Sequence, residues 1–142
     1  MIKPIGIIFA CSFLLAGCAG TGTSNYSYVA PVIFSDEKGK VFVLRESGFS
    51  GSGALTNVAV NGTSVGQLGT GEMLIANTNK GLNVLQVKVS GLQGMGLNSP
   101  TGQFQNDGDH NNYFVIGLKT GLLKNELTLL ETTESSWKEQ VN

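Results

Sequence analysis

The chain has 142 residues, and its acidic and basic side chains nearly balance, with a formal net charge of −1 at pH 7. No basic run with interleaved aromatic residues occurs, which argues against nucleic acid as a partner. Twenty Gly against three Pro, among many Val, Leu, Thr and Asn, indicate short strands joined by tight turns. The composition therefore predicts an all-β protein with a single domain.

The first 18 residues have the layout of an export signal. Lys3 is followed by an apolar run over residues 5–15, which is shorter than the roughly 20 apolar residues that a transmembrane helix needs. Leu15-Ala16-Gly17-Cys18 resembles the lipobox of bacterial lipoproteins, in which the Cys is acylated before cleavage. The resemblance implies that residues 1–17 are a signal peptide and that lipid on Cys18 anchors the mature chain to a membrane.

The residues after Cys18 predict the location and a tether. In Gram-negative lipoproteins an Asp directly after the Cys favours the inner membrane, so Ala19 implies the outer membrane, facing the periplasm. Cys11 lies in the excised segment and Cys18 carries lipid, so the mature chain has no thiol left for a disulfide. Residues 18–39 are expected to form the lipidated N-terminus, a flexible tether and an apolar arm that docks on the domain.

Residues 40–142 are predicted to form one seven-strand β-sandwich. The first strand is apolar on both faces, so it should be central, and Asn61-Gly62 should form a hairpin turn. Residues 91–111 show no sustained period and are expected to be a long loop. Residues 134–140 can form a short C-terminal helical turn, with Trp137 as a plug over the end of the sandwich. The predicted strands are Val41–Glu46, Ala54–Val60, Thr63–Leu68, Glu72–Asn77, Leu82–Ser90, Tyr113–Lys119 and Glu126–Thr132.

A family resemblance covers about residues 40–132. Residues 58–68 (VAVNGTSVGQL) and Tyr113-Phe114-Val115-Ile116 follow the order of motifs in the DUF2846 family of bacterial lipoproteins, which this chain resembles. Lys80-Gly81 stands where that family has Pro-Gly, and Met73-Leu74 where it has an aromatic pair. The resemblance implies a prealbumin-like or carboxypeptidase-regulatory-like β-sandwich with no known activity. The expected fold is therefore a prealbumin-like or immunoglobulin-like β-sandwich.

The residues that suggest chemistry are few. Asp107, Asp109 and Asn111 have the first three spacings of a calcium loop, although Asn112 and Leu118 occupy its Gly and Glu positions. His110 lies in a loop of Asp and Asn residues and is expected to be solvated. The glycine-rich loop over residues 47–53 matches neither a nucleophile elbow nor a phosphate-binding loop. We therefore expect no enzyme activity and no cofactor.

The sequence favours a non-catalytic module of the bacterial cell envelope that binds a protein or cell-wall partner. The alternatives are a small-ligand or calcium-binding domain and an anchoring subunit of an envelope secretion machine. Large apolar side chains on glycine-rich loops usually mark contact sites, or they fold back as a lid over the sandwich. The predicted contact residues are Phe49, Leu92, Met95 and Leu97.

Overall fold

The computed structural model describes residues 22, 38–47 and 54–141. Within these ranges the chain forms eight strands, one short 3₁₀ turn and one short C-terminal helix. The sequence predicted seven strands, so that number is wrong by one. The elements are β1 (Lys40–Arg45), β2 (Thr56–Val60), β3 (Thr63–Leu68), β4 (Met73–Asn77), β5 (Gly81–Val89), η1 (Leu92–Gly94), β6 (Thr101–Asn106), β7 (Asn112–Thr120), β8 (Asn125–Thr132) and α2 (Glu134–Val141).

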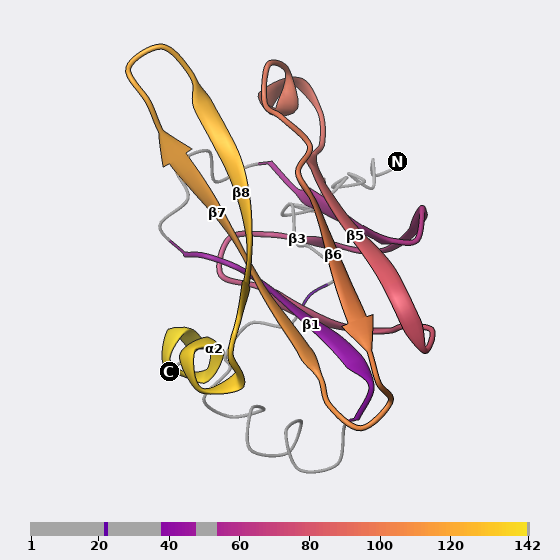
Figure 1. Cartoon of the computed structure of the whole chain (residues 1–142). Coiled ribbons are helices and arrows are strands. Elements are labelled where there is room, and N and C mark those ends of the chain that lie inside the picture. Colours follow the sequence, from indigo (N-terminus) through magenta and orange to yellow (C-terminus); the bar gives the residue numbers. More distant parts are fainter. Residues whose placement is uncertain (1–21, 23–37, 48–53, 142) are drawn as a thin grey trace, which may run out of the picture.

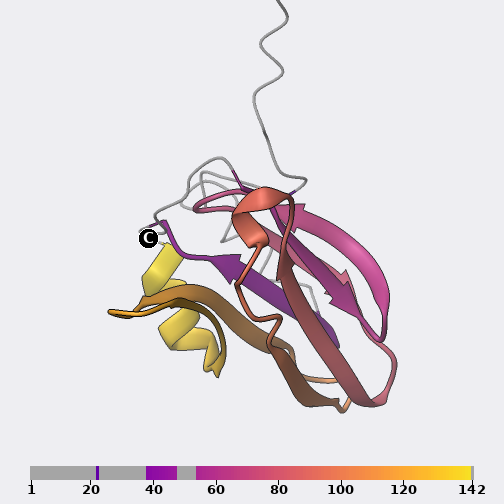
Figure 2. The same cartoon turned by 90° about the horizontal axis from the view of Figure 1, so that it is seen from above.

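The strands form two four-stranded sheets, in the orders β4-β1-β7-β8 and β3-β2-β5-β6. The pair β1–β7 is parallel, and the other neighbours are antiparallel. Apolar side chains from both sheets, such as Val43, Val87 and Phe114, form one buried cluster between them. The two sheets therefore pack face to face, as in a β-sandwich, with the helix outside this pair of layers (Figures 1 and 2).

The central position predicted for the first strand is confirmed, because β1 pairs with β4 on one side and β7 on the other. Val41 and Val43 belong to the cluster between the sheets. Phe42 belongs to a second buried cluster on the opposite face of the same sheet. Successive side chains of a strand point to opposite faces, so a strand covered on both sides needs a continuous apolar run.

Trp137 lies in this second cluster and not over the end of the sandwich as expected. It is fully buried against Phe42 and Tyr113, with ring centroids 5.7 and 5.8 Å away. Its Nε1 donates a hydrogen bond to the carbonyl of Phe114 (3.2 Å), which satisfies the one polar atom of a buried indole. These contacts of Trp137 hold α2 against the outer face of β1 and β7. Thr133 precedes α2 and caps it, because its Oγ1 accepts a bond from the N–H of Ser136 (3.3 Å).

The eighth strand, β6, lies inside the stretch that was expected to be a long loop. Its residues do alternate, with Phe104 and Asn106 buried and Gln103 and Gln105 exposed, but only one inward residue is a large apolar one. Gly102 is inward because a Cβ there would approach the Phe114 ring to 3.1 Å. The apolar period is therefore too weak to predict a strand. The antiparallel pairing with β5 makes this segment a strand.

The predicted Asn61-Gly62 hairpin is confirmed between β2 and β3, where both residues have positive φ (50° and 81°). Positive φ at both central positions gives a turn whose twist matches that of the flanking strands. The Asn61 side chain also binds β5, because its Oδ1 accepts a bond from the N–H of Val84 (2.9 Å). This turn therefore fixes the register of three strands.

The strands define two ends of the sandwich. The asparagine end holds the β2–β3 and β6–β7 turns and the start of β1, and is built on Asn61, Asn79, Asn83, Asn106 and Asn111. The apolar end holds η1, the β3–β4 turn and the β7–β8 hairpin tip, where Leu92, Met95, Leu122 and Leu123 are exposed. Figure 1 shows η1 and the hairpin tip at the same end of the molecule.

One buried arginine ties the two sheets together at the apolar end. Arg45 ends β1, and its Nη1 donates to the carbonyls of Ala54 (2.5 Å), just before β2, and Leu68 (2.9 Å), at the end of β3 in the other sheet. Burial lowers the pKa of this guanidinium and the charge of Glu72 opposes that shift, so the group stays a cation. These hydrogen bonds therefore fix the position of the backbone from which the loops of the apolar end begin.

Candidate functional site

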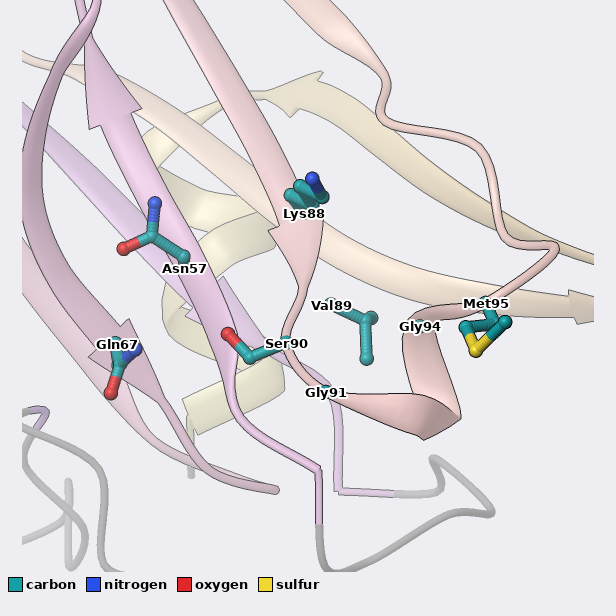
Figure 3. Close-up of a pocket in the computed structure, with 8 residues that line it drawn as sticks. All are labelled: Asn57, Gln67, Lys88, Val89, Ser90, Gly91, Gly94 and Met95. Carbon is teal, nitrogen blue, oxygen red and sulfur yellow. The ribbon is translucent and has the colours of Figure 1, made fainter.

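A groove with a volume of about 590 Å³ opens on the outer face of the second sheet. Its floor is a row of polar side chains across three strands: Asn57 of β2 pairs in register with Gln67 of β3 and with Lys88 of β5. Thr56 and Val58, on either side of Asn57, are fully buried, so the alternation of a strand turns Asn57 outward. Figure 3 shows the three side chains on adjacent strands.

The wall of the groove at the apolar end is the turn that follows β5. Ser90, Gly91, Gly94 and Met95 line it, with Met95 on the far side of the glycines from Lys88 (Figure 3). Gly94 packs directly on the backbone of β5, because a Cβ there would lie 2.1 Å from the carbonyl oxygen of Val89. Only glycine allows the turn to sit this close to the strand.

Asn98 fastens the same loop to the other sheet. Its Nδ2 donates to the carbonyl of Leu127 (2.9 Å), and its Oδ1 accepts from the N–H of Leu127 (2.7 Å). The amide side chain thus makes the pair of bonds that a neighbouring strand would make to β8. The groove wall is held from two sides, by β5 beneath it and by β8 beside it.

The groove offers hydrogen-bonding groups and one cation. Lys88 supplies a cation, while Asn57, Gln67 and Ser90 supply amide and hydroxyl groups; the Asn57 Oδ1 already accepts a bond from Ser64 Oγ (2.6 Å). None of the described lining residues carries a carboxylate or an imidazole. The side chain of Met95 adds a flexible apolar surface, of the kind that adapts to different partners.

The structure describes three of the four predicted contact residues, and these differ in how exposed they are. Leu92 and Met95 are exposed, at 82% and 75% of their surface, and Met95 belongs to the groove. Leu97 is partly buried and packs against the main core, so it follows the lid interpretation that the sequence left open. Phe49, together with the rest of the glycine-rich loop from residue 48 to 53, lies outside the described residues.

The predicted calcium residues lie at the asparagine end, in the turn between β6 and β7. The Asp107 Oδ1 accepts bonds from the N–H groups of Asp109 and His110 (both 2.8 Å), and its Oδ2 contacts His110 Nδ1 at 2.6 Å. The Asn111 Oδ1 accepts a bond from the N–H of Lys40 (3.0 Å). These oxygens therefore have roles in shaping the turn. Over the part of the chain that the structure describes, no three His, Cys, Asp or Glu side chains gather closely enough to hold a metal ion.

The hydrogen bonds in this turn change two pKa values. Backbone N–H groups of His110 and Asp109 and the His110 ring lower the pKa of Asp107 to about 2. The carboxylate in turn raises the pKa of His110, first by its hydrogen bond and then by its charge. The His110 side chain is 84% exposed, as the sequence analysis expected, but it is bonded to Asp107 rather than only to water.

The floor of the groove was not predicted from the sequence. The alternation of apolar and polar residues in β5 turns Lys88 outward, and the alternation around Asn57 and Gln67 gives the same orientation. What the sequence does not show is that these three positions meet, because the register of β3, β2 and β5 depends on the Asn61-Gly62 turn and on a shift in pairing between Val58 and Ala59.

Cys18 and the other residues of the predicted signal lie outside the described residues. Among those described, no helix has the length and apolar character needed to cross a membrane. No model of a known protein family matches the chain, and neither does any curated protein or solved structure.

Proposed function

We propose that the chain is a lipoprotein of the bacterial cell envelope, anchored through Cys18 in the outer membrane and facing the periplasm. Its domain is a prealbumin-like or immunoglobulin-like β-sandwich that binds a protein or cell-wall partner and performs no catalysis. The observation that carries the anchor is the order of Lys3, the apolar run and Leu15-Ala16-Gly17-Cys18, which is the layout of a lipoprotein signal. The proposal includes the resemblance of residues 40–132 to the DUF2846 lipoproteins, which rests on the order of motifs alone, since no family model matches the chain.

The groove beside η1 is the proposed contact site for the partner. It combines a polar floor of Asn57, Gln67 and Lys88 with the exposed Met95 on its rim. Partner sites usually have an apolar contact surrounded by polar groups that set the orientation. Its open shape suits an extended segment, such as a peptide or a glycan strand, that lies across β3, β2 and β5.

Lipidation is tested by metabolic labelling with a tagged fatty acid. The wild-type chain should take up label, and Cys18→Ala should not, because that substitution removes the only thiol at the predicted acylation position. Cys11→Ala is the matched control and should leave labelling unchanged, since Cys11 belongs to the excised segment. An unlabelled wild-type chain would refute the proposed anchor.

The contact site is tested by placing a photo-crosslinking amino acid at Met95 of the full chain in cells. Adducts should form with one dominant partner, protein or cell-wall glycan, and should fall at least about fivefold when Lys88→Ser and Asn57→Ser are added. Leu82, on β5 at the asparagine end and 59% exposed, is the matched control position. Equal yields at Met95 and Leu82 would mean that the groove is not the contact site.

A further inference from the structure

The β7–β8 hairpin carries two adjacent leucines at its tip. Leu122 and Leu123 are fully exposed, at 106% and 100%. The N–H of Gly121 donates to the carbonyl of Lys124 (3.1 Å), which closes a tight turn with both leucines at its apex. Turns normally carry Gly, Asn, Asp or Ser, so the conformation of the turn does not explain two leucines at its apex.

Cationic side chains flank this apex. Lys119 and Lys124 line the same shallow hollow as the two leucines, together with Glu126. Lys124 pairs with Glu126 (2.9 Å) and remains 71% exposed. An apolar tip between lysines is the arrangement that suits an anionic lipid surface, because the apolar groups enter the hydrocarbon while the ammonium groups stay among the headgroups.

The hairpin tip also lies at the end of the sandwich nearest to the proposed lipid anchor on Cys18. Gly22 lies against Leu68 and Met73, at the apolar end, so closely that a Cβ on it would be 2.5 Å from Leu68 Cδ2. The four residue-to-residue steps from Cys18 to Gly22 span at most about 14 Å. Met73 is level with Leu44 of β1, and Arg45, the next residue, is level with Ile116 of β7.

The length by which the hairpin extends beyond Ile116 is similar to the length that the chain from Gly22 to Cys18 can span. β7 continues from Ile116 to Thr120 before the turn begins, which adds about 13 Å at the usual rise of a strand. Figure 1 shows the β7–β8 tip projecting beyond the rest of its sheet, at the same end as η1. A bilayer within reach of a lipid on Cys18 is therefore also within reach of Leu122 and Leu123.

We propose that Leu122 and Leu123 insert into the bilayer that holds the lipid anchor, with Lys119 and Lys124 among anionic headgroups. The placement rests on the proposed lipidation of Cys18, whereas the exposure and charge of the tip do not. A projecting apex fits a deformable lipid surface without any complementary cavity, and a protein partner would need one. The domain thus has a second, reversible membrane contact that fixes its orientation, and the groove opens to the side.

Photo-crosslinking in intact cells tests the insertion. A diazirine amino acid is placed at Leu122 or Leu123 of the full chain, and Leu82 at the opposite end is the matched control. Phospholipid adducts, identified by mass spectrometry, should form at least about fivefold more at the hairpin than at Leu82. Lys119→Gln with Lys124→Gln should lower that yield. Mainly protein adducts at the tip, or equal lipid yields at both ends, would overturn the proposal.

A second measurement does not depend on adduct chemistry. Leu123→Cys should react with a membrane-impermeant maleimide at least about fivefold more slowly than Leu82→Cys in the membrane-bound chain, and equally fast once detergent has removed the bilayer. Equal rates before detergent would overturn the insertion. Fatty-acid labelling of the same sample separates the two proposals: an unlabelled chain refutes the anchor, and a labelled chain with an accessible tip refutes the insertion.

Discussion

The two ends of the sandwich use side chains in opposite ways. At the asparagine end, Asn83 is fully buried and makes four hydrogen bonds: its Nδ2 donates to the carbonyls of Asn79 and Gly81, and its Oδ1 accepts from Asn61 Nδ2 and from the N–H of Asn79. At the apolar end, Leu122 and Leu123 are exposed over their whole surface. One end is closed by internal bonds, and the other presents apolar groups outward.

Asn106 repeats the pattern of the asparagine end. Its Nδ2 donates to the carbonyl of Gly39 (3.1 Å) and to Thr78 Oγ1 (2.7 Å), while its Oδ1 accepts from the N–H of Gly108 (2.8 Å). An amide side chain that bonds backbone groups replaces the bonds that strand ends lose when the sheet stops. The difference between the ends therefore separates residues that stabilise the fold from exposed residues that contribute little to it.

Asn83→Ala should have the largest effect on stability. It removes four hydrogen bonds and empties a fully buried position, so we expect a loss of about 2–4 kcal/mol in the free energy of unfolding. In a domain of this size that corresponds to a melting temperature lower by about 10 °C or more. Thermal unfolding of the full chain, followed by circular dichroism, measures it.

Leu123→Ser is the matched substitution at the apolar end. A fully exposed side chain contributes little to the folded state, so the free energy of unfolding should change by less than about 0.5 kcal/mol. If the two substitutions lower the melting temperature equally, the contrast between a stabilising end and a contact end is wrong.

Gly94→Ala should have an intermediate effect, because it tests the one close-packed position of the groove wall. The new methyl group would lie 2.1 Å from the Val89 carbonyl oxygen, so the turn must move away from β5. We expect a loss of about 1–3 kcal/mol, as for other overpacked sites, and a lower crosslinking yield from Met95. Ser99→Ala, an exposed position in the same loop, is the control and should leave both quantities unchanged.

Local patterns predicted most of the strands, because their apolar residues recur with a period of two. They also predicted the central place of β1 and the Asn61-Gly62 turn, where the residue types themselves determine the backbone conformation. β6 was missed because its inward positions are Gly102, Phe104 and Asn106, and only the pairing with β5 makes that set a strand. Trp137 was misplaced because nothing local distinguishes the end of a sandwich from the outer face of a sheet.

The candidate site depended still more on long-range register. Met95 was identified from its apolar side chain on a glycine-rich loop, and this signal needs no partner. Asn57, Gln67 and Lys88 are ordinary outward residues until three strands bring them into one row. Leu97 has the same local signal as Met95 but packs on the core, so exposure of a loop residue cannot be predicted from glycine content alone.

The smallest expected effect concerns charge at the asparagine end. The raised pKa of His110 means that its contribution to stability is complete below about pH 6.5 and is lost as the pH rises through its pKa in the folded protein. The pKa of Asp107 is lowered to about 2. Its contribution to stability is therefore complete above about pH 3.9 and is lost as the pH falls toward the pKa of about 2 in the folded protein. The turn is therefore most stable between these limits.

Both side chains are exposed, so the effect should be read from the titration of His110 rather than from the melting temperature. In an NMR titration of the wild-type chain, the single His should have a pKa above 6.5, and Asp107→Asn should lower it because the substitution removes both the hydrogen bond and the charge. Asp109→Asn removes only a weaker charge effect and should lower it less. If Asp107→Asn leaves the pKa of His110 unchanged, the contact between the two side chains does not form in solution, and the asparagine end would be held by its amide side chains alone.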